Sequence, residues 1–416
     1  MARILAYTSP ARGHLFPLTP ILDELSRRGH EIALRTLASQ VAMMRSRGFA
    51  AWPIDERVEA IQIDDWRAGN PRAALGRAFR RFQDRAEHDG PDLRQAIAVE
   101  HPDALLVDIN CWGGLAAAEA WGGPWATFCA FPMFLRSRDV PPFGPGLAPA
   151  RGLLGRLRDR VLRPIVLGTI ERGMLPALNE VRNRLGLPPL AHADDLLLRP
   201  PLVIYMTAEP FEYPRSDWPE SVVMVGPCDW DPPAELPRWL EEITAPIVLV
   251  TTSSEFQNDG RLVQAAIEGL AGEPYTVVAT LPAGDPARFS TPANVRVERF
   301  LPHGAVLDRS VCAVTHAGMG ATQKALARGV PVCAVPFGRD QLEVARRVEV
   351  AGAGTRLPAN RLSPDRLRLK VRQALTKAEG AKRVAQAFAA AGGPRAAADA
   401  FETRLIGSRA PAARQE

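Results

Sequence analysis

Apolar residues in the first half of the chain are gathered into short runs, each about the length of a β-strand. The runs are residues 3–7, 31–36, 104–108 and 125–128. After the first run, apolar side chains follow helical spacing from Pro17 until Gly29 ends the helix. We therefore predict a parallel sheet with crossover helices, in which residues 9–16 form the first loop between strand and helix.

A second series with the same alternation begins near Ser221 and runs through the second half. Its strand-length runs are residues 247–251, 275–279, 295–298, 311–314 and 332–335. A Pro- and Asp-rich stretch, residues 226–233, has the composition of a linker. A chain of 416 residues is also long for one core, so we predict two α/β domains, with residues 1–215 in the first and 216–380 in the second.

The segments outside these two series carry less regular patterns. Residues 135–200 are irregular, with a Pro/Gly stretch followed by a basic helical pattern over 151–185. Up to Arg163 this pattern is amphipathic, which favours a surface lid helix over the alternative of a helix that contacts a membrane. Residues 381–416 begin with an Ala-rich segment that is predicted to be helical, and the tail beyond Ser408 is expected to be disordered.

Charge and cysteine content exclude several classes of protein. The formal net charge is +5, which suits a diphosphate substrate and equally an ordinary solvated surface. No Lys/Arg run with interleaved aromatics indicates nucleic acid, and no apolar run approaches the ~20 residues of a membrane span. The N-terminus leads directly into a strand, so we expect a cytoplasmic protein. The cysteines lack paired or metal-like spacing, which predicts reduced, buried thiols; they are Cys111, Cys129, Cys228, Cys312 and Cys333.

A candidate anion site follows the fourth strand of the second series. The strand ends in His316 and the small residues 317–320, and a helix opens at about Thr322. Glycines let a phosphate approach the backbone, and a helix N-terminus attracts negative charge. His316 can donate a hydrogen bond to a diphosphate oxygen. A further strand and loop, residues 332–341, end in polar groups suited to sugar hydroxyls.

This order of residues resembles the nucleotide-sugar signature of the family 1 glycosyltransferases, bacterial natural-product enzymes of the macrolide and polyketide type among them. The family pattern is His-Gly-Gly-x-Gly-Thr, a helix with Glu-Ala-Leu, then Gly-x-Pro and Pro-x-x-x-Asp-Gln. The chain matches it at His316, Gly318, Gly320, Ala325, Leu326, Gly329, Pro331, Pro336, Asp340 and Gln341. The resemblance implies the GT-B fold, in which two Rossmann-like parallel-sheet domains face each other across a cleft and a C-terminal helix crosses back to the first domain.

The resemblance also implies a donor site in the second half. There Phe300 would stack on the nucleobase and the backbone of Leu301 would pair with the base edge, although a core position explains Phe300 equally well. Hydroxyls after a strand suit a phosphate, which favours Ser253 and Ser254 over an ordinary polar turn. The predicted donor-binding residues are Ser253, Ser254, Phe300, Leu301, His316, Gly318, Met319, Gly320, Ala321, Thr322, Asp340 and Gln341.

Two departures from the family pattern concern the donor. Lys324 stands where the family commonly has Glu, and Ala321 where it has Thr, for which Thr322 is a candidate replacement. That Glu accepts hydrogen bonds from ribose hydroxyls, which Lys cannot do because it carries donors only. A dTDP-sugar, which lacks one of those hydroxyls, would lose less than a UDP-sugar. The alternative is that Lys324 points to solvent and has no bearing on the donor.

A second anchor is the sequence Gly13-His14-x-x-Pro17, which the family also carries. A carboxylate on one ring nitrogen of His14 would fix its tautomer and make it a better general base. Asp108 closes a strand of the same predicted sheet, and the resemblance assigns both positions to the acceptor-activating dyad of the family. The alternatives are a loop histidine bonded to backbone and an aspartate that caps a helix.

Apolar residues near the expected cleft suggest a large, flat or greasy acceptor, although most of them would also suit a core. The predicted acceptor-binding residues are Phe16, Trp66, Phe82, Trp112, Phe131, Met133, Phe134 and Phe143.

Together with the resemblance, these residues predict an inverting glycosyltransferase that needs no metal or other cofactor. His14 would take the acceptor proton while His316 and the helix start stabilise the departing nucleoside diphosphate. No Asp-x-Asp pair is placed to hold a metal. The expected partners are a UDP- or dTDP-sugar and a hydrophobic small molecule, bound by a monomer or homodimer. Glycosylation of a lipid or sterol, and an auxiliary role beside another glycosyltransferase, are the alternatives.

Overall fold

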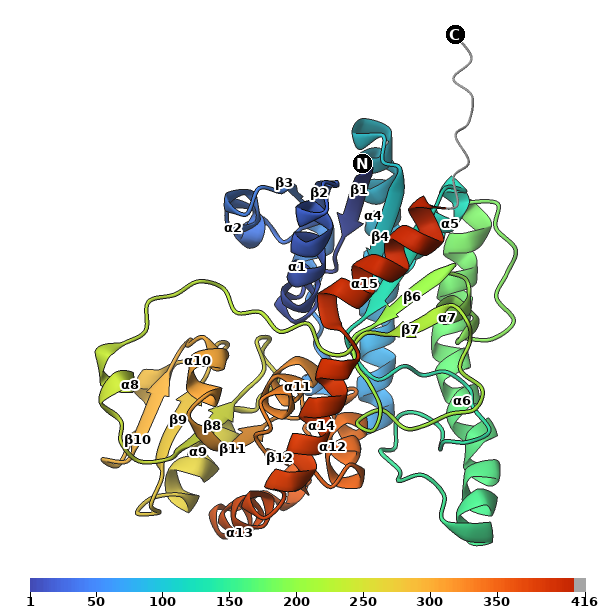
Figure 1. Ribbon diagram of the computed structural model, residues 1–416. Coiled ribbons are helices and arrows are strands. Elements are labelled where there is room, and N and C mark those ends of the chain that lie inside the picture. Colours follow the sequence, from blue (N-terminus) through green and yellow to red (C-terminus); the bar gives the residue numbers. More distant parts are fainter. Residues whose placement is uncertain (408–416) are drawn as a thin grey trace.

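Residues 1–407, which the computed structural model describes, form two separate parallel sheets (Figure 1). The first has seven strands in the order β3-β2-β1-β4-β5-β6-β7, and the second has six in the order β10-β9-β8-β11-β12-β13. Parallel strands need long crossovers, which the helices between them supply. The predicted pair of α/β domains is thus confirmed. The tail expected to be disordered lies outside the described residues.

Most strands are short apolar runs with little exposed surface, as expected for parallel sheets that helices cover on both faces. In the first sheet they are β1 (Arg3–Tyr7), β2 (Glu31–Thr36), β3 (Ala50–Pro53), β4 (Ala104–Asp108), β5 (Trp125–Cys129), β6 (Leu202–Tyr205) and β7 (Val222–Met224). In the second they are β8 (Ile247–Thr251), β9 (Thr276–Thr280), β10 (Val295–Glu298), β11 (Ser310–Thr315), β12 (Val332–Ala334) and β13 (Gly354–Arg356).

The helices of the first domain differ greatly in length. They are α1 (Arg12–Arg27), α2 (Val41–Ser46), α3 (Glu56–Ala60), α4 (Pro71–Glu100), α5 (Trp112–Trp121), α6 (Gly152–Arg184) and α7 (Asp195–Leu198). The long helices α4 and α6 pack on each other and on α5. The first turns of α6 reach past them into solvent, where Leu153 and Leu154 are 82% and 84% exposed.

The second domain carries shorter helices. They are α8 (Arg238–Glu242), α9 (Gly260–Gly269), α10 (His303–Leu307), α11 (Met319–Ala327), α12 (Gln341–Val350), α13 (Pro364–Leu375) and α14 (Ala378–Ala390). The last helix, α15 (Gly393–Phe401), continues into one π-helical turn, Glu402–Ile406.

Two expected boundaries are wrong. The strand β7 pairs with β6 in the first sheet, so the second α/β series begins not near Ser221 but with β8. The sequence of a short edge strand does not indicate which sheet the strand joins. The sequence pattern therefore places β7 in the wrong series. The helix α1 begins at Arg12, so residues 9–16 are only in part a loop.

The Ala-rich C-terminal segment is two helices where the sequence predicted one. Gly392 and Gly393 have φ of 86° and 57°, a left-handed conformation that glycine adopts at little cost, and they break the helix there. The helix α14 packs on the core of the second domain through Ala381 and Phe388. The chain then crosses to the first domain (Figure 1), as the predicted fold requires.

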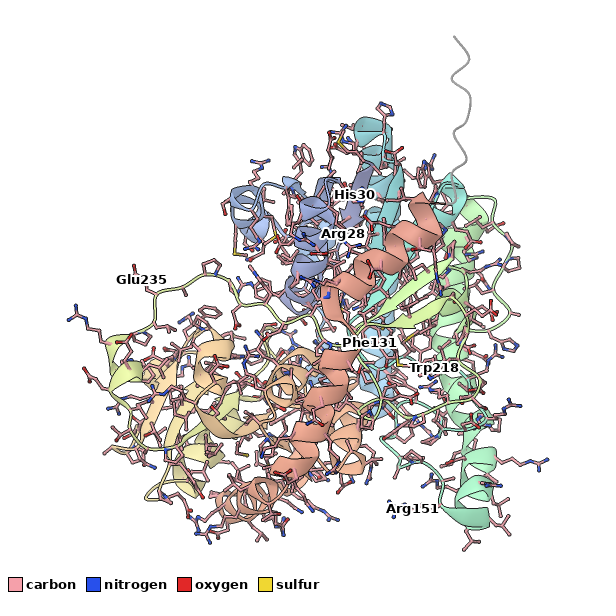
Figure 2. The ribbon with its side chains drawn as sticks, viewed as in Figure 1. Arg28, His30, Phe131, Arg151, Trp218 and Glu235 are labelled. Carbon is pink, nitrogen blue, oxygen red and sulfur yellow. The ribbon has the colours of Figure 1, made fainter. Side chains whose placement is uncertain are left out.

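Helix α15 is anchored on α1 by packing and by charge. Phe401 is fully buried in the core beneath α1. Arg28, at the end of α1, pairs with Asp399 and Glu402, both at 2.6 Å. The Nε2 atom of His30 lies 2.9 Å from Glu402, and Figure 2 shows Arg28 and His30 next to this helix. The last described turns of the chain thus complete the first domain.

Candidate active site

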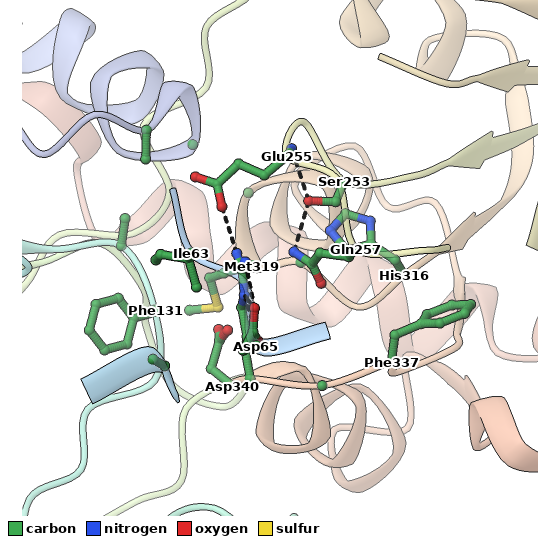
Figure 3. A pocket seen from close by; sticks show the side chains of 18 of the residues that line it. Ile63, Asp65, Phe131, Ser253, Glu255, Gln257, His316, Met319, Phe337 and Asp340 are labelled. Carbon is green, nitrogen blue, oxygen red and sulfur yellow. Dashed lines mark hydrogen bonds and ion pairs between the residues drawn. The ribbon is translucent and has the colours of Figure 1, made fainter. Parts of the chain in front are cut away.

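A cleft of about 1500 Å³ lies between the two domains. Its walls include the residues that follow β1, β4 and β5 in the first sheet and β8, β11 and β12 in the second. These are the carboxyl ends of parallel strands, where ligands of such sheets bind. Figure 3 shows Ile63 and Phe131 of the first domain on one side of the cleft, with Ser253 and His316 of the second on the other.

His14 and Asp108 meet in the first domain. The adjacent strands β1 and β4 end side by side, and His14 lies in the first turn of α1, directly after β1. Its Nδ1 is 2.9 Å from Asp108 Oδ1. The other carboxylate oxygen of Asp108 accepts from the backbone N–H and the hydroxyl of Ser9, at 2.9 and 2.5 Å. Asp108 is fully buried and does not itself line the cleft, whereas His14 does.

The environment makes His14 a stronger base. Burial lowers the pKa of His14, but the Asp108 carboxylate outweighs burial, and the net pKa lies above its usual value. Burial also raises the pKa of Asp108, while His14 and the hydrogen bonds from Asn110 and Ser9 lower it to a net value below its usual range. Asp108 therefore stays ionised and fixes the proton of neutral His14 on Nδ1. The Nε2 lone pair is left to take a proton from the cleft side.

Sequence reasoning missed Asn110, which lies two residues after β4. Its side-chain Nδ2 is 3.1 Å from His14 Nε2, and its backbone N–H donates to Asp108 Oδ1 at 3.0 Å. A lone Asn after a strand belongs to no motif that we recognised in the sequence, so only the folded arrangement identifies it.

The segment predicted to bind an anion lies where β11 leads into α11. Gly318 is the N-cap residue, so no side chain covers the first N–H groups of α11. A Cβ atom at Gly318 would lie 2.3 Å from His316 Nε2, which explains why this close approach needs glycine. Gly318, Met319, Gly320 and Ala321 line the cleft, as do Ser253 and Ser254 after β8.

The pKa of His316 is shifted in the opposite direction from that of His14. It is buried, and its Nδ1 faces the carbonyl oxygen of Thr251 at 3.5 Å. Burial lowers the pKa of His316 more than the nearby Asp259 carboxylate raises it. His316 is therefore neutral near pH 7 in this structure.

The residues expected around the nucleobase and ribose also line the cleft. Phe300 is 44% exposed, which contradicts a core position, and Leu301 follows it on the same wall. The side chain of Lys324 is only 13% exposed, so the alternative that it points to solvent is wrong. Its Nζ pairs with Asp231 at 2.6 Å and with Asp229 at 3.1 Å, both in the segment expected to be a linker.

Besides Asp108, three predicted site residues do not line the cleft. Thr322 is buried and shares a hydrogen bond with Thr315 at 3.1 Å, because it points from α11 toward β11. The side-chain oxygen of Gln341 accepts from the N–H groups of Phe337 and Gly338, so it holds the loop while Asp340 faces the cleft. Met133 is buried in a small apolar core.

The remaining aromatic residues form an apolar wall in the first domain. Those that line the cleft are Phe16, Trp66, Phe82, Trp112, Phe131, Phe134 and Phe143. Trp112 and Phe82 stack with ring centroids 5.3 Å apart, and Trp66 meets Phe256 of the second domain at 4.8 Å. The inner part of α6 adds Ile165 to this wall; the outer part is the solvent-exposed tip.

Two further observations bear on partners. Among residues 1–407, no group of three or more His, Cys, Asp or Glu side chains is arranged to hold a metal ion. Over the same residues, none of the helices combines the length and apolarity needed to cross a bilayer.

The chain is similar to known proteins along most of its length. It is 34% identical over 393 residues to 4'-demethylrebeccamycin synthase of Lentzea aerocolonigenes, covering 90% of this chain and 92% of that protein. It is 26% identical over 428 residues to demethyllactenocin mycarosyltransferase of Streptomyces fradiae, covering 97% of this chain and 87% of that protein.

A family match and a solved structure support the same relationship as these two relatives. Residues 266–403 match the family described as erythromycin biosynthesis protein CIII-like, C-terminal domain. The crystal structure of the calicheamicin glycosyltransferase CalG4 has the same fold, with a TM-score of 0.73 at 22% identity over 99% of this chain and 100% of that chain. The chain therefore belongs to the natural-product glycosyltransferases of family 1 and has their GT-B fold.

Proposed function

We propose that this glycosyltransferase moves a sugar, with inversion, from a UDP- or dTDP-sugar to a hydroxyl of a hydrophobic natural product. The observation that carries the proposal is the His14–Asp108 pair, in which Asp108 holds Nδ1 and His14 lines the same cleft as His316 and the start of α11. A base and an anion site on opposite walls are what a direct displacement at a sugar carbon needs.

In the proposed reaction the acceptor oxygen attacks the anomeric carbon as its proton passes to His14 Nε2. A bond forms between that oxygen and the anomeric carbon, while the bond from this carbon to the diphosphate oxygen breaks on the opposite face. The leaving diphosphate takes the electron pair, and the α11 N-terminus with His316 stabilises its charge. Asp108 stabilises the imidazolium that forms, so the residues described here account for the step without a metal.

The experiment is a comparison of His14→Ala with the unmodified protein, using donor-depletion assays read by mass spectrometry. Loss of the general base should lower turnover by ~10²–10⁴-fold. Calorimetric affinity for UDP and dTDP should change little, since His14 lies across the cleft from the anion site. Turnover within a few-fold of the unmodified protein would refute the role of His14.

The same assay separates an enzyme from an auxiliary partner. The purified chain should transfer sugar by itself, because both the dyad and the anion site are present. Absence of turnover with every donor and acceptor tested, restored by adding a second glycosyltransferase, would support the auxiliary role instead.

A lipid acceptor is the second candidate, and α6 is the observation that favours it. Exposed Leu153 and Leu154 lie at the outer end of the helix whose inner residue Ile165 lines the cleft. Leu157 and Val161, both more than half exposed, lie on the same face of α6 between the outer leucines and Ile165. An acceptor panel that pairs each aglycone with a long-chain analogue tests this, since a lipid-specific enzyme should transfer only to the long-chain member.

A further inference from the structure

One polar residue contacts both members of the dyad. The Nδ2 atom of Asn110 is 3.1 Å from His14 Nε2, the nitrogen assigned above to take the acceptor proton. The backbone N–H of Asn110 donates to Asp108 Oδ1 at 3.0 Å, and the same oxygen lies 2.9 Å from His14 Nδ1. Asn110 lines the cleft beside His14, so its side chain is within reach of an incoming acceptor.

The chemistry of the two side chains changes when the proton moves. Neutral His14 with its proton on Nδ1 has a lone pair on Nε2, which accepts from an amide N–H. Protonated His14 has a donor at Nε2 and needs an acceptor there. A carboxamide carries both groups, and a half-turn about its last torsion exchanges the NH₂ for the carbonyl oxygen.

We propose that Asn110 is a positioning residue that follows this proton. In the empty site its NH₂ group donates to Nε2 and keeps His14 in the form that can act as a base. After the acceptor hydroxyl has given its proton to Nε2, the Asn110 carbonyl oxygen accepts from the new N–H until that proton passes to solvent. The inference rests on the proposed function for the source of the proton, whereas its first test needs neither substrate.

The charged groups around His14 show why such a residue matters. Asp108 after β4, Glu255 after β8 and Asp340 before α12 all favour the protonated ring, and Arg339 lies between the last two. The ring of Phe131, 5.9 Å away, contributes no charge. The donating amide of Asn110 favours the neutral ring against these carboxylates.

The first test is an NMR titration of ¹⁵N-histidine-labelled protein without substrate, with the His14 signals assigned from His14→Gln. In the unmodified protein, neutral His14 should carry its proton on Nδ1. In Asn110→Asp, a carboxylate that only accepts replaces the amide, so the pKa of His14 should rise by about one pH unit or more. Gln40→Glu is the matched control, because Gln40 is also on the cleft wall but is hydrogen-bonded to Ser39.

Two NMR results would overturn the proposal. One is an unmodified protein whose neutral His14 carries the proton mainly on Nε2, a result that needs no variant to fold. The other is a His14 pKa shift in Asn110→Asp no larger than in Gln40→Glu. Neither result depends on transfer, so failure of the inference is distinguishable from failure of the proposed function.

Kinetics give the second test. The acidic limb of the pH profile of kcat/KM should move up with the NMR pKa of His14 in Asn110→Asp. In Asn110→Leu, which offers neither donor nor acceptor, kcat should fall while KM for the donor stays the same. A change confined to protein stability, with kcat and the pH profile unaltered, would show that Asn110 is only a structural residue.

Discussion

At the level of single residues, His14 and His316 of the cleft are prepared for opposite tasks. The pKa of His14 is raised, which suits a group that gains a proton during the reaction. The pKa of His316 is lowered by burial, yet a diphosphate oxygen can only accept a hydrogen bond. Neutral His316 that keeps its proton on Nδ1, facing the Thr251 carbonyl oxygen, has no proton on Nε2 to donate to the diphosphate.

We therefore predict that nucleoside diphosphates bind with uptake of a proton by His316. Affinity should fall as pH rises from about 6 to 8, by at most tenfold per unit for one proton. His316→Ala should lose a charge-assisted hydrogen bond, ~1.5–3 kcal/mol. Calorimetry with UDP and dTDP in two buffers of different ionisation enthalpy measures both quantities. Affinity that is unchanged in His316→Ala would remove this residue from the site.

At the level of elements, the sequence predicted the strands that burial marks with apolar runs. It did not predict features that depend on contacts between distant segments. Apolar runs mark β1, β4 and β8 because parallel strands are covered on both faces. Helix α4 has a largely polar sequence interrupted by Gly90 and Pro91, which together resemble a loop. In the fold, Gly90 permits close packing on α5, since a Cβ there would lie 3.0 Å from the carbonyl oxygen of Gly113.

For the candidate site, too, the sequence predicted some features and not others. Motif spacing placed His14 and His316 on the correct strand ends, because a nucleotide site requires fixed loop lengths. The directions of Thr322 and Gln341 are set by hydrogen bonds to Thr315 and to the 337–338 backbone, and Asn110 meets His14 from 96 residues away in the chain. Such contacts leave no periodic trace in a single sequence.

Helix α11 is tied to the connection between the domains, and this contact bears on the choice of donor. The carboxylates of Asp229 and Asp231 are both engaged by Lys324. Lys324 offers no acceptor to a ribose 2'-hydroxyl. We predict that dUDP, which lacks only that hydroxyl, binds at least as tightly as UDP in competition calorimetry. A clear preference for UDP would contradict this.

The substitution Lys324→Glu tests the same donor preference less directly, because it has a second effect. Lys324→Glu would place a third carboxylate beside Asp229 and Asp231, so repulsion would disturb the linker as well as the ribose site. Asp308→Asn is a suitable control, because Asp308 belongs to the neighbouring ion pair with Arg328 but does not line the cleft.

At the level of the whole molecule, a buried ion pair joins the two domains. Glu212, between β6 and β7, meets Arg347 of α12 at 2.8 and 3.1 Å. Arg347 also pairs with Glu343, which accepts from the backbone N–H groups of Gly144 and Gly146. Burial raises the pKa of Glu212, but the Arg347 charge outweighs burial and holds the net pKa below its usual value.

Removal of Arg347 should therefore reverse the pH dependence that Glu212 confers. In the unmodified protein the lowered pKa stabilises the fold above about pH 4.3, and this contribution is lost as pH falls through the folded pKa. In Arg347→Met, Arg215 and the Tyr205 hydroxyl still lower the pKa of Glu212, but the largest lowering influence is gone, so burial should raise that pKa. The variant should lose ~3–5 kcal/mol of unfolding free energy at pH 7 and recover part of it at pH 5.

Urea unfolding at the two pH values measures this, with Arg347→Met/Glu212→Gln as the control in which position 212 no longer titrates. The double variant should be less sensitive to pH than the single one between pH 5 and 7. An equal loss in Arg347→Met at both pH values would show that the pKa of Glu212 does not rise when Arg347 is removed.

The return of α15 to the first domain also governs the order in which the protein can mature during synthesis. The ribosome makes the strands of the first sheet early, yet Phe401 and Leu405, which belong to the same core, emerge last. The second domain, complete once α14 has been made, can fold before the first is finished. A premature stop between α14 and Phe401 would spare every strand, His14 and His316, yet leave apolar surface beneath α1 uncovered.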